Sequence, residues 1–330
     1  MNILFYGFRH SHLLSYYKKA VMHPAIHILA AVEEDAAARA QASEQLGVAF
    51  SDQSYEAWLN DPAVETVAIG TAYGDRGRAV IQALSHGKHV LCDKPICTSL
   101  EELEAIRMLA AEKGVTVGCL LDLKYMPCIL PAKKLLDSKC LGPIHNISFT
   151  AQHCLNYGKR PSWYFEKGMH GGTINDIAIH GIDILPYLTG HRLAVLDAAR
   201  TWNAYATEHP HFDDCAIFMG RTNKGAGVLA DVSYAAPQQG TLPTYWRFEI
   251  WCERGLVSLC AAEPTVTVYE KGMKDIRILP GEDHAVTMLD EFLQAVSAGG
   301  QEMTERVLCA THTALRIQQA ANRATGGILL

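Results

Sequence analysis

The sequence lacks the features that mark several classes of protein. Its 330 residues hold no run of about 18 consecutive apolar side chains, which a membrane-spanning helix needs. The 29 lysines and arginines are scattered and are outnumbered by 35 acidic residues, so no basic patch suggests binding to nucleic acid. None of the ten cysteines belongs to a Cys-x-x-Cys pair, which would indicate a zinc knuckle or a redox dithiol. We therefore expect a protein that binds neither membranes nor nucleic acid.

The beginning of the chain and its cysteines favour one compartment. The first residues, MNILFYGFRHSH, do not read as a signal peptide, because no basic region precedes the short apolar run. Most cysteines lie within apolar segments, which is typical of reduced core cysteines. A cytoplasmic protein is expected.

The length of the chain favours two domains, and its pattern changes near residue 122. In residues 1–122 short apolar strands alternate with helical segments, which predicts a doubly wound parallel sheet of the Rossmann type. The predicted strands are 2–6, 26–32, 66–69, 89–92 and 115–121, and the predicted helices are 36–46, 76–85 and 100–113. This domain is expected to bind a dinucleotide.

Residues 123–330 have a different pattern. A helix at 129–138, a strand at 144–152 and a glycine-rich turn at 168–172 precede an apolar helix. Successive strands without intervening helices follow over 194–270, which predicts an antiparallel sheet. Two helices, at about 284–298 and 304–323, close the chain. The second domain is therefore predicted to be α+β and to bind the substrate.

The turn after the first strand is a candidate dinucleotide loop. Glycines at this turn let the backbone approach a pyrophosphate at the start of the following helix. The loop reads GFRHSH over residues 7–12, so Gly7 fills the first place of Gly-x-Gly-x-x-Gly, but Arg9 and His12 stand in the second and third. An ordinary strand-to-helix turn is the alternative.

Glu33 ends the second strand, 26 residues after Gly7. An acidic side chain at this position accepts hydrogen bonds from the ribose hydroxyls of NAD and repels the 2′-phosphate of NADP. The next residues, Glu34 and Asp35, are also acidic, which favours NAD over NADP. A solvated acidic turn is the alternative.

Lys94 follows a predicted parallel strand, in the run CDKP. Ligands of such sheets bind at the carboxyl ends of the strands. A lysine there can hold a substrate hydroxyl or stabilise an alkoxide, and the neighbouring Pro95 is a candidate for a cis peptide bond. The alternative is a surface lysine in front of a helix.

Asp176 and His180 are four residues apart in an apolar helical segment, so they share one face. Polar groups on a buried helix need partners or a ligand. A histidine beside a carboxylate is a common general base, because imidazole titrates near neutral pH. A core histidine and a metal site are the alternatives, but no third ligand is evident nearby, and we expect no metal.

These residues together resemble the glucose–fructose oxidoreductase / inositol dehydrogenase / MocA (Gfo/Idh/MocA) family over nearly the whole chain. The run GKHVLCDKP looks like the family's Glu-Lys-Pro segment, with Asp93 in the place of the usual glutamate. The Gly-Gly turn followed by Asp176-x-x-x-His180 looks like its second signature. Two segments depart from the pattern: Thr71 begins a Thr-Ala-Tyr segment in place of Thr-Pro-Asn, and residues 122–125 differ from the usual Asn-x-Arg-Phe.

The resemblance implies a Rossmann domain followed by a domain with an open, mostly antiparallel sheet. It implies an NAD-dependent oxidoreductase in which His180 takes the proton of a secondary hydroxyl on a sugar or cyclitol. Lys94 would orient that hydroxyl, and Asp176 would bind the substrate or orient His180. The implied cofactor contacts are Gly7, Phe8, Arg9, His10, Glu33, Thr71, Tyr73, Asp93 and Lys94. The expected substrate contacts are Lys94, Lys124, Tyr157, Trp163, Asp176 and His180.

Two other functions use the same residues. The altered glycine loop is compatible with a sensor of dinucleotide or sugar that has no turnover. A lyase or glycoside hydrolase in which bound NAD transiently oxidises the sugar is also compatible. The resemblance further implies a homodimer or homotetramer formed through the sheet of the second domain.

Overall fold

A computed structural model describes residues 1–237 and 245–324. The chain divides into two compact units, and each contains segments that are distant in sequence. Unit 1 consists of residues 1–120, 168–171 and 286–312. Unit 2 consists of the described residues of 121–167, 172–285 and 313–330. Each unit is built around one sheet.

Unit 1 contains a five-stranded parallel sheet in the order β2-β1-β3-β4-β5. The sheet confirms the predicted doubly wound fold. Its strands are buried apolar segments close to the predicted ranges: β1 (Asn2–Tyr6), β2 (His27–Val32), β3 (Thr66–Ile69), β4 (His89–Cys92) and β5 (Val117–Cys119). The last strand is shorter than the predicted 115–121.

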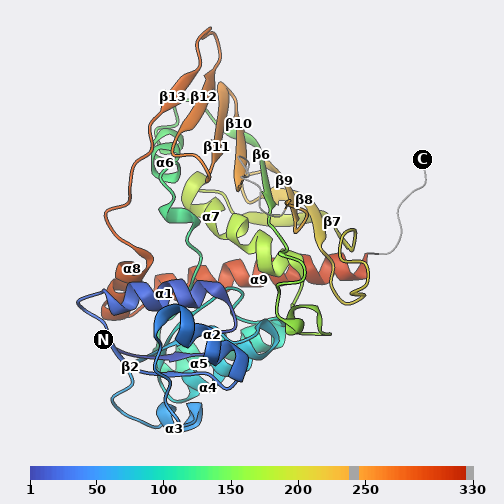
Figure 1. The fold of residues 1–330 in the computed structure, drawn as a ribbon. Coiled ribbons are helices and arrows are strands. Elements are labelled where there is room, and N and C mark those ends of the chain that lie inside the picture. The colour runs from blue at the N-terminus through green and yellow to red at the C-terminus, as the bar shows by residue number, and fades with distance from the viewer. Residues whose placement is uncertain (238–244, 325–330) are drawn as a thin grey trace. The chain divides into compact units, whose positions relative to one another are not determined.

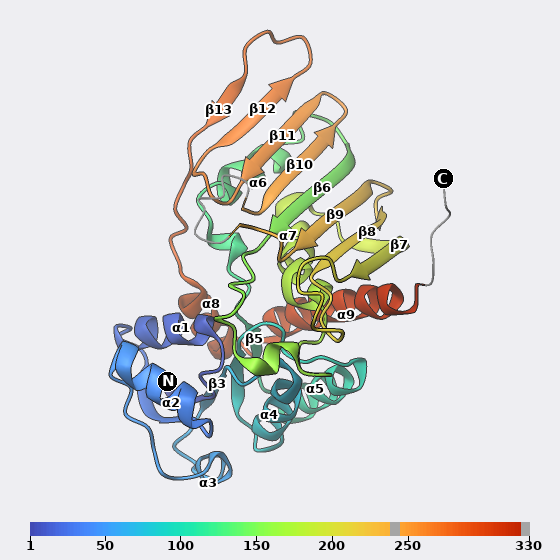
Figure 2. The same cartoon turned by 45° about the vertical axis from the view of Figure 1, so that its right-hand side comes forward.

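Helices pack on this sheet in two pairs, α1 with α2 and α4 with α5. In Figure 2 the blue pair and the teal pair lie on opposite sides of the strands labelled β3 and β5. The helices of unit 1 are α1 (Ser11–Val21), α2 (Ala36–Leu46), α3 (Tyr55–Leu59), α4 (Tyr73–Ser85), α5 (Leu100–Lys113) and α8 (Met288–Ser297). The sequence pattern missed α1 and α3, and α4 begins three residues before the predicted helix.

Local sequence explains where several of these helices begin and end. The side chains of Asp35 and Ser99 accept a backbone N–H in the first turn of α2 and α5, which satisfies a donor that the helix cannot pair. The same helices end at Gly47 and Gly114, both at φ 64°, a left-handed conformation that glycine adopts at little cost. These capping residues fix the helices that cover the sheet.

The strand order changes direction between β1 and β3, and their carboxyl ends meet at Gly7. Gly7 has φ 77°, and a Cβ added there would lie 2.6 Å from the backbone nitrogen of Thr71. Only glycine allows this approach of two loops. Sheets of this kind bind ligands at such a switch point, so the fold places residues 7–12 and Thr71 at a binding edge.

Unit 2 contains an eight-stranded sheet in the order β13-β12-β11-β10-β6-β9-β8-β7. Figure 1 shows these strands side by side. They are β6 (Ile144–Gln152), β7 (Leu193–Trp202), β8 (Cys215–Thr222), β9 (Gly227–Ser233), β10 (Arg247–Cys252), β11 (Gly255–Cys260), β12 (Val266–Glu270) and β13 (Arg277–Leu279). All neighbouring pairs are antiparallel except β6 with β9, so the predicted mostly antiparallel sheet is confirmed.

Helices cover one face of the sheet in unit 2, and Gly181 of α7 shows how closely they pack. A Cβ at Gly181 would lie 2.5 Å from the ring of Phe149 on β6, so only glycine fits there. The helical segments of this unit are η1 (Leu123–Tyr125), α6 (Ile129–Asp137), η2 (Ser162–Phe165), the π-helical η3 (Ile174–Ala178) and α7 (Ile179–Thr189). The last helix, α9 (Gln301–Arg323), contributes residues to both units.

Two further expectations concern the whole chain. The ten cysteines all lie among the described residues and all are free thiols, seven of them buried, which confirms the prediction of mostly core cysteines. Within the described ranges, no helix combines the length and the apolar character that crossing a membrane requires.

Candidate active site

The loop after β1 is closed by Glu33 from the end of β2. The Glu33 carboxylate accepts the backbone N–H of Phe8 and, at 2.8 Å, that of Asp35. Burial raises the pKa of Glu33, while these N–H donors oppose the rise. Arg9 lies 3.4 Å from the carboxylate of Asp35. The predicted acidic residue is therefore buried and shapes the loop, and the basic residue of the loop is paired with an acid.

Asp93, at the end of β4, is fully buried and gathers several polar groups. His10 Nδ1 lies 2.7 Å from its Oδ2 and His12 Nδ1 lies 3.2 Å from its Oδ1, while Arg76 Nη2 is 3.7 Å from Oδ2. Burial disfavours the ionised carboxylate, but His10, His12 and Arg76 outweigh it and hold the pKa of Asp93 well below its usual value. Burial also lowers the pKa of His10 to about 4, so its imidazole is neutral at pH 7.

Lys94 is held in position through its backbone. Its N–H donates to Asp93 Oδ1 at 2.7 Å, and its carbonyl accepts from Arg76 Nη1 at 2.6 Å. The Lys94–Pro95 peptide bond is cis, as the sequence suggested. Lys94 is 4% exposed, which rules out the surface lysine that was the alternative interpretation. A buried cation on such a rigid loop is suited to binding a substrate oxygen.

Tyr73, the first residue of α4, packs between the groups of this cluster. Lys94 Nζ lies 5.8 Å and the Arg76 guanidinium 4.7 Å from the centre of its ring. The rings of His10 and His170 lie 5.5 and 5.8 Å away. Tyr73 is fully buried, so unit 1 brings four of the predicted cofactor residues together at the Tyr73 ring and the Asp93 carboxylate: His10, Tyr73, Asp93 and Lys94.

In unit 2 the π-helical segment η3 carries Asp176, which is 1% exposed. Tyr164 donates to its Oδ2 at 2.9 Å, and Tyr234 donates to the same oxygen. Two phenol donors fix the orientation of this carboxylate. Short π-helical turns occur frequently at functional sites, and this one separates Asp176 from the regular turns of α7.

His180, in the first turn of α7, is 5% exposed and lies edge-on to the ring of Trp246 at 5.5 Å. The adjacent Gly181 allows the close contact of α7 with the sheet described above, so the backbone beside His180 is fixed by packing. The predicted pair therefore lies on one continuous helical segment of a buried core. An imidazole on a fixed backbone can exchange a proton with a bound hydroxyl.

The other predicted substrate residues of unit 2 lie in three different settings. Lys124, in η1, is half-buried with its ammonium 5.0 Å from the ring of Tyr187. Trp163, in η2, is buried and packs against Tyr164 at 5.0 Å. Tyr157 donates to Glu208 and lies 3.1 Å from His209 Nε2. Trp163 thus supports the tyrosine that holds Asp176.

Sequence reasoning missed three residues that organise these groups. Arg76 was assigned only to a helix, His12 only to the place of a missing glycine, and Tyr234 to a strand. The signal for Arg76 was a charged residue within the apolar face of a predicted helix. Nothing local marks Tyr234, since it lies 58 residues from Asp176 and contacts it only in the folded chain.

Two family models match this chain. Residues 6–120 match a model described as an oxidoreductase family with an NAD-binding Rossmann fold. Residues 129–258 match the C-terminal domain model of the same Gfo/Idh/MocA family.

Curated relatives match over part of their length. The chain is 28% identical over 198 residues to the levoglucosan dehydrogenase of Pseudarthrobacter phenanthrenivorans, covering 58% of this chain and 50% of the relative. It is 32% identical over 200 residues to the scyllo-inositol 2-dehydrogenase (NAD(+)) of Bacillus subtilis, covering 60% and 56%. The chain therefore spans about half the length of the curated relatives it matches.

Solved structures share the fold over nearly the whole chain. A levoglucosan dehydrogenase in complex with NADH and levoglucosan has a TM-score of 0.80 at 19% identity, covering 98% of this chain and 97% of that one. An NAD-binding protein from Listeria innocua has a TM-score of 0.78 at 20% identity, covering 97% and 94%. At these identities the likeness establishes the fold.

Proposed function

We propose that this chain, which belongs to the Gfo/Idh/MocA oxidoreductase family, is an NAD-dependent dehydrogenase or reductase. Its proposed substrate is a secondary hydroxyl or ketone of a sugar, cyclitol or related polyol. The observation that carries the proposal is the complete set of Lys94, Asp176 and His180. Each is at least 95% buried and is held in place by packing or by hydrogen bonds to its backbone or side chain. The similarity to levoglucosan and scyllo-inositol dehydrogenases supports a polyhydroxylated substrate.

The chemistry requires a proton acceptor and a group that stabilises negative charge. NAD⁺, when bound, supplies the acceptor for the hydride that leaves the hydroxyl-bearing carbon. His180 takes the hydroxyl proton on a ring nitrogen, and the Lys94 ammonium stabilises the charge that develops on the oxygen. Asp176, oriented by hydrogen bonds from two tyrosines, offers an acceptor to a substrate hydroxyl or to the histidine. In the reverse direction the same groups return the proton to a ketone.

The residues around Gly7 fit NAD better than NADP. Gly7 has no side chain, so the backbone at the switch point can approach a pyrophosphate closely. Glu33 lies at the ribose position of such folds, and the nearby Asp35 already pairs with Arg9. A 2′-phosphate would therefore meet two carboxylates and one cation that is already paired. Lys94 and Tyr73 are the proposed contacts on the nicotinamide side.

Replacing His180 with alanine tests the proposed activity. Loss of a general base lowers turnover by roughly 10²–10⁴-fold, so we expect kcat to fall by about 10³-fold. Turnover is followed at 340 nm with a panel of sugars, cyclitols and sugar phosphates. The exposed His145 on β6 provides the matched variant, His145→Ala, which should keep wild-type turnover.

Cofactor binding is measured on the same proteins. NAD⁺ and NADH should raise the melting temperature of the wild type and of His180→Ala alike, because His180 is not a proposed cofactor contact. Equal turnover of His180→Ala and wild type would refute the proposed base. Absence of any shift with NAD(H) or NADP(H) would refute the dehydrogenase itself.

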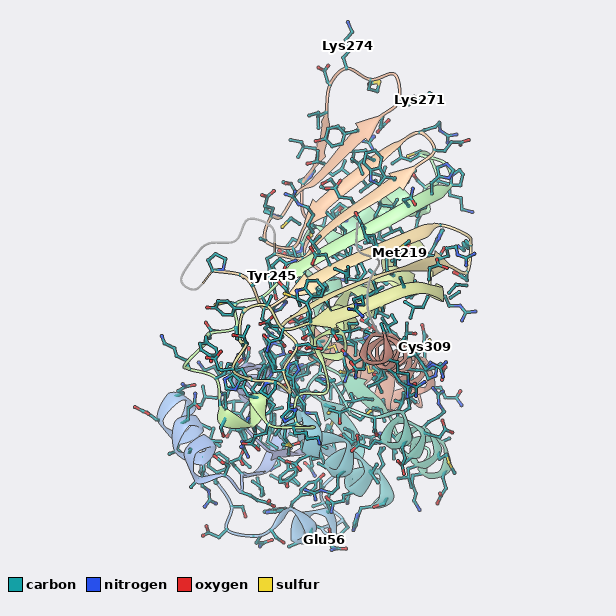
Figure 3. The ribbon with its side chains drawn as sticks, turned by 90° about the vertical axis from the view of Figure 1, so that its right-hand side faces the viewer. Glu56, Met219, Tyr245, Lys271, Lys274 and Cys309 are labelled. Carbon is teal, nitrogen blue, oxygen red and sulfur yellow. The ribbon has the colours of Figure 1, made fainter. Side chains whose placement is uncertain are left out.

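We further propose that the open face of the eight-stranded sheet joins copies of this chain. Large apolar side chains are exposed on neighbouring strands of unit 2, with Met219 of β8 directly opposite Leu229 of β9. Figure 3 shows Met219 on the sheet. The exposed fractions of this apolar face are Ile217 42%, Met219 50%, Leu229 55%, Trp251 51%, Tyr269 45% and Ile278 63%. Large apolar side chains exposed on one face of a sheet are typical of a protein interface.

Replacing Leu229 with glutamate is expected to weaken the homo-oligomer at least 30-fold, about 2 kcal/mol, because a carboxylate would be buried beside Met219 in the interface. Light scattering after size exclusion over a range of concentrations measures the change. Met273→Glu is the control, since this exposed methionine lies between Lys271 and Lys274, which Figure 3 labels at the far end of the β12–β13 hairpin. A monomeric wild type, or an unchanged oligomer in Leu229→Glu, would contradict this interface.

The proposed location is the cytoplasm. All ten cysteines are free thiols, and burial raises the pKa of Cys92 to about 12, which keeps that thiol protonated and unreactive. Free thiols persist in reducing compartments, which supports this assignment.

A further inference from the structure

We propose that His10, His12 and Asp93 form a binding site for one divalent transition-metal ion of the zinc type. The three residues come from the turn after β1, the first turn of α1 and the end of β4, all within unit 1. His10 and Asp93 are also among the implied cofactor contacts, but none of the three side chains takes part in the proposed proton and hydride transfer. Metal binding is measured here without dinucleotide, so this proposal can hold or fail independently of the proposed dehydrogenase.

The geometry of the three side chains is close to that of a metal site. His10 Nδ1 and His12 Nδ1 lie 2.7 and 3.2 Å from the two oxygens of Asp93, and one ligand atom from each residue lies within 4.8 Å of the others. Zinc binds nitrogen and oxygen at about 2.0–2.2 Å, which places tetrahedral ligands roughly 3.4 Å apart. The widest separation therefore has to close by at most about 1.4 Å.

The position of the three residues also suits a metal. Asp93 is fully buried and His10 is 7% exposed, so two of the ligands are fixed by the fold. The His12 side chain is 41% exposed, which leaves a route from solvent to the cluster. His12 also occupies the place of the third glycine of a dinucleotide loop. An imidazole at that place does not let the backbone approach a pyrophosphate as glycine does. Metal binding would explain why a histidine stands there.

The ligand set selects the kind of ion. Two imidazoles and one carboxylate suit zinc and its neighbours among the transition metals, whereas magnesium and calcium prefer oxygen ligands. Arg76 lies 3.7 Å from Asp93 and already neutralises much of its charge. The positive charge of Arg76 repels every cation at this site. Only ions that form strong bonds to imidazole nitrogen should therefore be retained. Three protein ligands leave a fourth tetrahedral position for water or an anionic donor such as a phosphate oxygen.

Metal binding is measured on the full chain after treatment with a chelator, without dinucleotide or substrate. Equilibrium dialysis against Zn²⁺, with metal content determined by mass spectrometry, gives the stoichiometry and affinity. Co²⁺ provides a second readout through its visible absorption, and Mg²⁺ is the negative probe. His12→Ala and His12→Gln remove the accessible ligand, and the glutamine keeps a hydrogen-bond donor for Asp93. His27→Ala, an exposed histidine at the start of β2, is the control.

We expect one Zn²⁺ per chain in the wild type and in His27→Ala, and at least tenfold weaker binding in both His12 variants. Circular dichroism confirms that the variants are folded. If the wild type binds no stoichiometric Zn²⁺, or if both His12 variants bind it as the wild type does, the proposal is wrong. The two imidazoles would then act only as hydrogen-bond donors to Asp93.

Discussion

Replacing Lys94 with alanine is expected to lower kcat by about 10³-fold while the protein remains folded and binds NADH. The expected loss corresponds to about 4 kcal/mol of transition-state stabilisation, the size of effect that one preorganised charge near a developing oxyanion provides. The side chain is 96% buried, whereas the hydrogen bonds that hold its loop are made by backbone groups of Lys94, which alanine keeps. The defect should therefore appear in turnover and not in stability.

Steady-state kinetics with the best substrate of the sugar panel measures this effect, and titration of NADH by fluorescence measures binding. Lys113→Ala provides a control, since Lys113 is an exposed lysine at the end of α5. Lys94→Arg should also be slow, because a planar guanidinium does not replace a compact ammonium in a buried site. If Lys94→Ala kept kcat within about twofold of the wild type, Lys94 would not act on the reacting oxygen.

The fold could be predicted to the extent that it depends on local pattern. Short apolar strand patterns identified both sheets, and the predicted helices 36–46 and 100–113 have the bounds of α2 and α5. Contacts between segments distant in sequence could not be predicted from local pattern. An amphipathic helix shows that it has a buried face, but not which sheet it covers, so the return of residues 286–312 to unit 1 was not foreseen. The parallel pairing of β6 with β9 also joins distant segments and could not be predicted from local pattern.

The candidate site divides in the same way. Lys94, Asp176 and His180 could be found because polar residues stand out in apolar segments with recognisable spacing. Their supports could not, because a supporting residue is defined by contacts across the fold. Tyr234 reads as one more aromatic residue beside a strand, yet it binds Asp176. Glu33 and Arg9 were predicted as cofactor contacts from the usual loop, but their contacts with Asp35 could not be read from the sequence.

Arg76 provides the prediction with the largest expected effect on stability. Its guanidinium is fully buried and donates to the carbonyls of Thr71, Lys94 and Pro95, at 2.6, 2.6 and 3.1 Å, while facing Asp93. Arg76→Met keeps much of the volume but leaves three buried carbonyls and one carboxylate without this cation. Breaking a buried pair by removing one partner costs about 3–5 kcal/mol, so we expect the free energy of unfolding to fall by that amount. Urea titration followed by circular dichroism measures it.

A double-mutant cycle shows whether the loss comes from the Asp93 charge. Asp93→Asn removes that charge, so Asp93→Asn combined with Arg76→Met should lose clearly less stability than the sum of the two single losses. Arg78→Met is the matched control on the same helix, because Arg78 has a 74% exposed side chain and should change stability by less than about 0.5 kcal/mol. Strictly additive losses would mean that Arg76 acts only through the carbonyls of the Lys94 loop. In that case the position of Lys94 would depend on hydrogen bonding to its backbone. The charge of Asp93 would then act mainly on His10 and His12.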